Sequence, residues 1–218
     1  MISILMAVKT GWQYFPEAYA SVCAQEHVAW ELLVGVNGLE YDSPVPDMIR
    51  SYTDGASADV FNLCASRNKP QALNRLVESA CGSHIAILDV DDVWHPWKLA
   101  KQLAYLRDYD VVGTMGDYFG TESGPIDVPC GPLSFDDMME KNCLLNSSVV
   151  MKREHAQWPD TDGLDDYPLW LELASQGKRL MNIGGEPLVK IRCHPGQHFP
   201  SRDDSHAIRE RYRAQHTA

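Results

Sequence analysis

Three carboxylates within four residues, Asp89-Val90-Asp91-Asp92, could do chemistry together, and they directly follow the apolar run 84–88. Carboxylates this close repel one another unless something cationic lies among them. A hard divalent ion such as Mg²⁺ or Mn²⁺ accepts carboxylate and phosphate oxygens at the same time. The stretch therefore predicts a site for a divalent metal and a phosphorylated ligand. A solvated acidic turn that caps the next helix is the alternative.

The charge of the whole chain limits what such a site could bind. The 218 residues include 19 Lys and Arg against 30 Asp and Glu, which gives a formal net charge of −11. Nonspecific binding of nucleic acid or anionic lipid needs clustered cations, so neither is expected as a partner. An acidic protein that holds a phosphorylated ligand needs either local cations or a bound metal.

The elements around the acidic stretch alternate between strand and helix. Apolar runs predict strands at 2–8, 30–36, 84–88, 110–115, 144–151, 179–183 and 187–193. Helical spacing and opening prolines predict helices at 16–25, 70–80, 96–106 and 166–176. Residues 39–60 are expected to be loop with room for one short helix, and 116–132 to be loops. The alternation predicts an α/β fold with a mainly parallel central sheet and helices on both faces.

Polar residues end several of these strands. They are Thr10, Asn37 and the acidic residues from Asp89 to Asp92. Parallel sheets bind ligands beyond the carboxyl ends of their strands, so we expect these side chains to line one cleft.

The remaining features indicate one domain inside the cell. Residues 1–200 are expected to form that domain and 201–218 a polar tail, either a surface helix or disordered. No stretch approaches the roughly 20 apolar residues of a membrane span, and the short apolar run at the N-terminus lacks the basic start of a signal peptide. The six cysteines are scattered without a CxxC pair, which favours reduced thiols and a cytoplasmic location.

Residues 87–99 (Ile-Leu-Asp-Val-Asp-Asp-Val-Trp-His-Pro-Trp-Lys-Leu) resemble the DxD segment of the family 2 glycosyltransferases with the GT-A fold. Other pieces are similar to the family in the same order, at 2–10, 19–25, 30–34, 69–74 with 80–82, 163–170 and 192–194. The resemblance covers about residues 2–196. It implies a single Rossmann-like GT-A domain that inverts the sugar's configuration with Mn²⁺ or Mg²⁺, and the expected donor is a UDP-linked sugar.

The resemblance also implies roles for the donor side. Asp91 would bind the metal with His194, and Asp89 would reach the ribose or a metal-bound water. The nucleotide-binding residues would be Ala7, Thr10, Asn37, Lys69, Asn74, Asp89 and Val90. For His194 and Lys69, an ordinary structural or surface role is the alternative.

Two departures from the family pattern affect these roles. Val36-Asn37 stands where the family often has paired aspartates, which leaves the preferred base open, and Lys9-Thr10-Gly11 lacks the usual proline. The Gln-x-x-Arg-Trp signature of processive synthases is also missing. Transfer of single sugars to a glycan or other hydroxyl acceptor is therefore expected.

On the acceptor side, the resemblance implies that Asp166 is the general base, with Asp165 beside it. Carboxylates at a helix start also serve as ordinary caps. Trp170, one turn along, could stack on a sugar or belong to the core.

Two other functions fit part of the pattern. Residues 89–93 satisfy the DxDx(T/V) motif of haloacid-dehalogenase-like phosphatases, in which Asp89 would be the nucleophile with Mg²⁺. That motif normally lies on the first strand of its domain, whereas two strands are expected to precede it here. A non-catalytic module that binds sugar nucleotides is the third possibility, and the acidic residues at both predicted sites argue against it.

Overall fold

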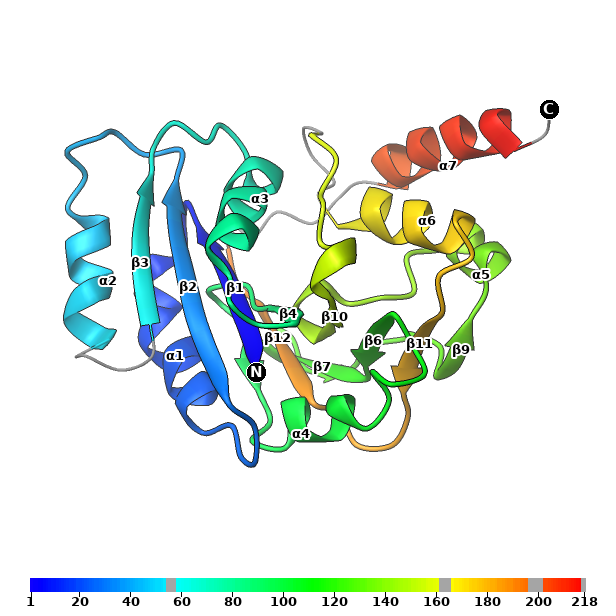
Figure 1. Cartoon of the computed structure of the whole chain (residues 1–218), viewed down its shortest axis with the longest axis horizontal. Helices are drawn as coiled ribbons and strands as arrows, with labels where there is room; N and C mark the ends of the chain where they lie inside the picture. The colour runs from blue at the N-terminus through cyan, green and yellow to red at the C-terminus, as the bar shows by residue number, and fades with distance from the viewer. Residues whose placement is uncertain (54–57, 161–165, 196–201, 217–218) are drawn as a thin grey trace.

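The computed structural model describes residues 1–53, 58–160, 166–195 and 202–216, and within the last range the side chains of 205–213. Asp165 and the remainder of the 161–165 segment lie outside the described residues. Figure 1 shows the elements in chain order, from β1 at the N-terminus to α7 near the C-terminus.

A large mixed sheet forms the centre of the described chain. Its eight strands run in the order β3-β2-β1-β4-β10-β6-β11-β9. The strands are β1 (Ile2–Val8), β2 (Trp30–Asn37), β3 (Ala58–Leu63), β4 (His84–Ile87), β6 (Val111–Thr114), β9 (Gly131–Leu133), β10 (Val150–Lys152) and β11 (Leu180–Ile183). From β3 to β4 every pairing is parallel, and β11 is parallel to β6, whereas β10 and β9 run antiparallel to their neighbours.

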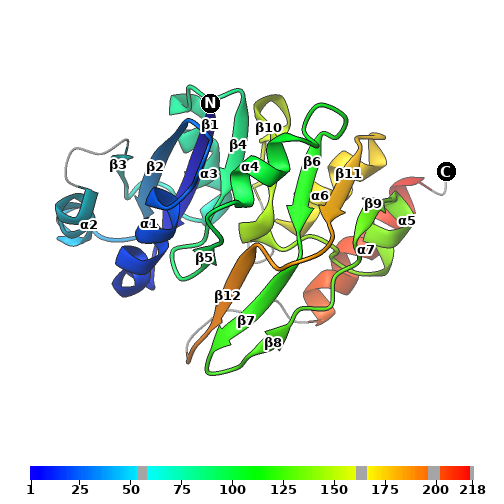
Figure 2. The same cartoon turned by 90° about the horizontal axis from the view of Figure 1, so that it is seen from below.

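A second, smaller sheet lies beside the first. Its order is β5-β12-β7-β8, built from β5 (Val93–Trp94), β7 (Gly116–Gly120), β8 (Gly124–Pro125) and β12 (Val189–Cys193). Figure 2 shows β12, β7 and β8 extending away from the large sheet. Because β5 directly follows Asp92 and pairs with β12, this sheet brings β12 close to the acidic stretch.

Helices cover both faces of the large sheet, as the sequence predicted. Successive residues of a strand point to opposite faces. Leu5 of β1 accordingly belongs to the core cluster that includes residues of α3 (Lys69–Ser79), α5 (Phe135–Glu140) and α6 (Tyr167–Ser175). Ile4 and Met6 belong to the cluster with α1 (Phe15–Cys23), α2 (Val45–Thr53) and α4 (Lys98–Leu103). The α/β fold predicted from the alternation is therefore confirmed.

The polar tail contains a helix, α7 (Arg202–His216), that contacts α6. The buried Tyr212 donates its hydroxyl hydrogen to the carbonyl of Pro168 at 3.1 Å. None of the helices in the described part of the chain combines the length and apolar character needed to cross a membrane.

The prediction of loops over 116–132 is wrong, since this range contains β7, β8 and the start of β9. Gly120, Gly124 and Gly131 have φ values of +99°, +123° and +93°, so they allow sharp bends at the ends of short strands. A glycine-rich stretch of two- to five-residue strands has no apolar period to detect. Residues 39–60 do contain the short helix, α2, but β3 also begins there. As an edge strand with half-exposed residues, β3 lacks an apolar run.

Candidate active site

The acidic residues form a tight turn at the carboxyl end of β4. The amide of Asp92 donates to the carbonyl of Asp89 at 3.1 Å, and Leu88 is tied to β1 through the carbonyl of Leu5 at 3.1 Å. A Cβ atom on Gly11, whose φ is +74°, would lie 3.3 Å from the Val90 side chain. The loop after β1 therefore packs against this turn, as expected for the carboxyl ends of neighbouring parallel strands.

Asp89 is held by a cation and two polar side chains. The Lys69 ammonium lies 2.7 Å from its Oδ1 atom, and the Asn146 amide donates to both carboxylate oxygens at 3.1 and 3.2 Å. Its own backbone N–H donates to the Ser147 hydroxyl at 3.0 Å. Burial alone would raise the pKa of Asp89, but the Lys69 charge and these hydrogen bonds bring it below the ordinary value. The surroundings of Asp89 therefore stabilise its negative charge.

Asp92 is the innermost of the three carboxylates, with an exposed fraction of 3%. It accepts hydrogen bonds from the Ser147 hydroxyl at 2.5 Å and from the backbone N–H of Arg192 at 2.9 Å. Burial, together with the charges of Asp89 and Asp91, raises its pKa well above the ordinary value. The contacts of Asp92 therefore fix the turn rather than offer a free ligand.

Asp91 faces His194, which follows β12. The Nε2 atom of His194 lies 3.0 Å from Oδ2 of Asp91, and the two side chains are only 16% and 18% exposed. Burial and the neighbouring Asp89 charge raise the pKa of Asp91. The other ring nitrogen, Nδ1, lies 3.0 Å from the carbonyl of Pro195. Because a carbonyl only accepts, Nδ1 carries the hydrogen there.

This pair has the donor chemistry of a metal site. A metal-binding histidine typically donates one ring N–H to a backbone carbonyl and presents the other nitrogen to the ion. Among the described residues, no group of three His, Cys, Asp or Glu side chains is arranged to hold a metal. A hard ion such as Mg²⁺ commonly uses one or two carboxylates and completes its shell with water and phosphate oxygens. The residues present therefore fit an ion that keeps open coordination positions rather than a closed structural site.

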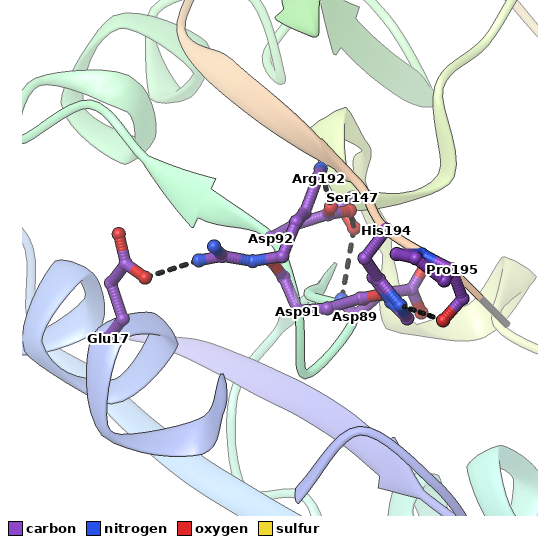
Figure 3. A network of polar contacts seen from close by, with 8 residues as sticks. All are labelled: Glu17, Asp89, Asp91, Asp92, Ser147, Arg192, His194 and Pro195. Atoms are coloured by element: carbon purple, nitrogen blue, oxygen red, sulfur yellow. Dashed lines mark hydrogen bonds and ion pairs between the residues drawn. The ribbon is translucent and has the colours of Figure 1, made fainter. Parts of the chain in front are cut away.

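Three residues of this network were not identified from the sequence. Asn146 and Ser147 belong to the short 3₁₀ turn before β10 (Asn146–Ser148), and Arg192 lies in β12. Figure 3 shows Ser147 and Arg192 beside the acidic turn, with His194 nearby. A polar Asn-Ser-Ser triplet at the start of an apolar stretch was the available signal for the first two.

The predicted base, Asp166, is the residue before α6, where it occupies the N-cap position without a side-chain cap hydrogen bond. Its Oδ2 atom accepts from the Asn142 amide at 3.3 Å. Asn146, four residues after Asn142 in the chain, donates to the carboxylate of Asp89. Four residues of extended chain span at most about 14 Å, so one short segment joins the predicted base to the acidic turn.

The other predicted donor-side residues lie at the same edge of the sheet. Asn37 ends β2 and is 2% exposed, Thr10 is exposed in the loop after β1, and Ala7 is half-buried in β1. Val8 pairs with Val36 in the parallel register, so the ends of these two strands are neighbours. Their contacts with a nucleotide remain predictions.

Two predicted site residues have other partners in the structure. The Asn74 amide donates to the carbonyl of Trp158 at 2.8 Å and accepts from its N–H at 2.9 Å, so both polar atoms are engaged by backbone. Trp170 is 0% exposed and lies in the core cluster, so it has no surface to stack on a sugar. For Trp170 the core alternative replaces the acceptor-side role. The sequence could not separate the two roles, because a tryptophan on a helix has the same spacing whether it stacks on a sugar or packs in the core.

Replacing Asn74 with Ala should therefore lower stability and leave nucleotide affinity nearly unchanged. The change leaves two backbone groups of Trp158 without their partner, which should lower the free energy of unfolding by about 1–3 kcal/mol. Urea unfolding measures the stability, and calorimetric titration with UDP measures the affinity. A large loss of UDP affinity in a variant of normal stability would restore the nucleotide-binding role.

Comparison with known proteins agrees with this geometry. The sequence model of glycosyl transferase family 2 matches residues 3–131, more than half of the chain. TuaG of Bacillus subtilis, which its name assigns to teichuronic acid biosynthesis as a glycosyltransferase, is 25% identical over 187 residues. That alignment covers 81% of this chain and 73% of TuaG.

Two solved structures share the fold. S. aureus TarS (1–349), in complex with UDP-GlcNAc, matches 95% of this chain and 64% of its own, with a TM-score of 0.73 and 14% identity. The mannosyltransferase PcManGT from Pyrobaculum calidifontis, in complex with GDP-Man and Mn²⁺, matches 99% of this chain and 61% of its own, with a TM-score of 0.66 and 19% identity. The chain thus spans a little under two thirds of either solved chain. The structures establish the GT-A fold, and the length of the sequence match decides the family: the chain belongs to glycosyl transferase family 2.

Proposed function

We propose that this chain transfers a single sugar from a nucleoside-diphosphate sugar, UDP-linked, to an acceptor hydroxyl, with inversion at the anomeric carbon and a divalent metal. The observation that carries the proposal is the pair formed by Asp91 and His194 beside the Lys69–Asp89 ion pair. These groups lie at the edge of the sheet where α/β folds bind ligands. The complexes of TarS with UDP-GlcNAc and of PcManGT with GDP-Man support a nucleotide-sugar donor.

On the donor side, the proposed work of the residues is to bind and orient the diphosphate. Asp91 and His194 would hold Mn²⁺ or Mg²⁺, which when bound offsets negative charge on the leaving nucleoside diphosphate. Lys69 is partly exposed beside Asp89 and could turn its ammonium to a phosphate oxygen. Asn37 would hydrogen-bond the base.

On the acceptor side, Asp166 would remove the proton from the attacking hydroxyl. Its carboxylate accepts a hydrogen bond from the Asn142 amide, which helps to orient it. A single base that assists direct attack, without a covalent intermediate, inverts the configuration of the anomeric carbon. The name of TuaG refers to teichuronic acid biosynthesis, which supports a glycan as the acceptor class.

The donor half of the proposal predicts that a divalent metal strengthens UDP binding. An acidic turn in a protein of net charge −11 repels a diphosphate unless a cation lies between them. Calorimetric titration of UDP should therefore show much tighter binding with Mn²⁺ than with EDTA, and GDP in place of UDP tests the base. Equal UDP affinity in Mn²⁺ and in EDTA would remove the metal from the proposal.

The alternatives fit less well. A match to a glycosyltransferase family over more than half of the chain speaks against a haloacid-dehalogenase-like phosphatase. Three strands also precede β4, the strand that ends in the acidic turn, whereas that phosphatase motif belongs on the first strand of its domain. A non-catalytic module that binds sugar nucleotides would have no use for a base such as Asp166. An assay of turnover with a panel of UDP-sugars separates such a module from an enzyme. All six cysteines are free thiols, which supports action in a reducing compartment such as the cytoplasm.

A further inference from the structure

Arg192 contacts the acidic turn through both its backbone and its side chain. Its backbone N–H donates to Oδ1 of Asp92 at 2.9 Å, and its Nε donates to the backbone carbonyl of Asp91 at 2.8 Å. One terminal nitrogen of the guanidinium also pairs with Glu17 of α1. Figure 3 shows the Arg192 side chain passing the acidic turn on its way to Glu17. Arg192 of β12 therefore contacts Asp91 and Asp92 in the acidic turn and also Glu17 of α1.

Two aromatic rings hold the guanidinium in place. Its central carbon lies 4.5 Å from the centre of the Tyr14 ring and 4.3 Å from that of Phe119, which is the neighbour of Arg192 in the β12–β7 register. The Arg192 side chain is 13% exposed. Contacts of a cation with ring faces at this distance are attractive, and burial strengthens them. The Tyr14 ring also lies 4.9 Å from the His194 ring, so it contacts both side chains.

The position of Arg192 in β12 links its contacts to the placement of His194. Alternate residues of a strand project to the same face, and His194 comes two residues after Arg192, just past the end of β12. Both side chains reach Asp91, Arg192 at its carbonyl and His194 at its carboxylate. We propose that Arg192 is a positioning residue that sets the distance and orientation between Asp91 and His194, and thereby the metal-dependent binding of the donor. This inference rests on the proposed function.

The role requires arginine rather than any cation. The planar guanidinium presents Nε and a terminal nitrogen in fixed directions and stacks on rings, whereas lysine has a single nitrogen and no plane. Lysine at this position would keep the charge and lose both the bond to the Asp91 carbonyl and the stacking. Glu17 is 56% exposed, and ion pairs with so much solvent contribute little. The positioning should therefore depend on the contact with Asp91 and hardly at all on the ion pair.

The test is calorimetric titration of UDP, in Mn²⁺ and in EDTA, for wild type, Arg192→Lys, Arg192→Gln and the control Glu17→Gln. In wild type, Mn²⁺ should raise the UDP affinity. In both Arg192 variants this gain should fall by about tenfold or more, as expected for a lost hydrogen bond to a group beside a metal ligand. UDP affinity in EDTA should stay at the wild-type value, and Glu17→Gln should change the gain by less than about threefold.

The outcomes distinguish a failure of the proposed metal-dependent function from a failure of the positioning role of Arg192. No gain from Mn²⁺ in the wild type would overturn the metal-dependent function and this inference with it. A wild-type gain that persists in either folded Arg192 variant would overturn the positioning role alone. Equal losses of affinity in Mn²⁺ and in EDTA, or loss of a cooperative melting transition in both variants, would show that Arg192 serves only the fold.

Discussion

Replacing Asp166 with Asn should lower turnover by roughly 10²–10⁴-fold, the usual contribution of a general base, and leave donor affinity almost unchanged. The substitution keeps the size of the side chain and can still accept a hydrogen bond from Asn142. It removes only the capacity to take a proton from the acceptor. Steady-state kinetics with saturating donor measures turnover, and calorimetry with UDP measures donor affinity. Asp and Asn cap helices about equally well, so the melting temperature should also stay the same.

The control for this experiment is Asp165→Asn, the same change at the preceding residue. This variant should keep nearly normal turnover if Asp166 is the base. A dead Asp165 variant with an active Asp166 variant would move the assignment by one residue. Normal turnover in both variants would contradict the proposed mechanism.

The strands that carry the donor side were the most predictable part of the fold. The apolar runs predicted at 2–8 and 30–36 correspond to β1 (Ile2–Val8) and β2 (Trp30–Asn37), because these strands are buried on both faces and read as continuous apolar segments. The small sheet could not be predicted in the same way. Its strand β7 is five residues long, half-exposed and bounded by glycines. The sequence did predict a strand at 187–193, which contains β12 and Arg192, but it missed β7, the strand with which β12 pairs.

The candidate site shows the same division between local and distant signals. Carboxylates clustered within four residues were visible in the sequence, but the partner of Asp92, Ser147, lies 55 residues away. A single sequence contains no register between β4 and the 3₁₀ turn that holds Ser147, so this contact had no signal. Residue type alone also could not decide between the two roles considered for Trp170, because a tryptophan that stacks on a sugar and one that fills a core share the same helical spacing.

Replacing Asp91 with Asn should abolish the metal-dependent part of donor binding and leave the fold intact. Asp91 is the carboxylate that faces His194, and an amide oxygen is a much weaker ligand for a hard divalent ion than a carboxylate. UDP affinity measured in Mn²⁺ should fall to the wild-type value in EDTA. Burial and the Asp89 charge raise the pKa of Asp91, so the folded protein disfavours this charge. Without metal, the variant should therefore melt at the wild-type temperature or above it.

The matched control is Asp47→Asn, which removes one negative charge from α2 at a side chain that is 85% exposed. If net charge alone governed donor binding, neither variant would bind UDP more weakly than the wild type, because each removes one negative charge. If Asp91 is a metal ligand, the two variants should diverge. Asp47→Asn should keep the thermal stabilisation by Mn²⁺ with UDP, about 2.7 kcal/mol when free ligand is 100-fold above Kd, and Asp91→Asn should lose it. Undiminished turnover of Asp91→Asn at limiting Mn²⁺ would place the metal on other residues, and the pairing of Asp91 with His194 would then be a structural contact.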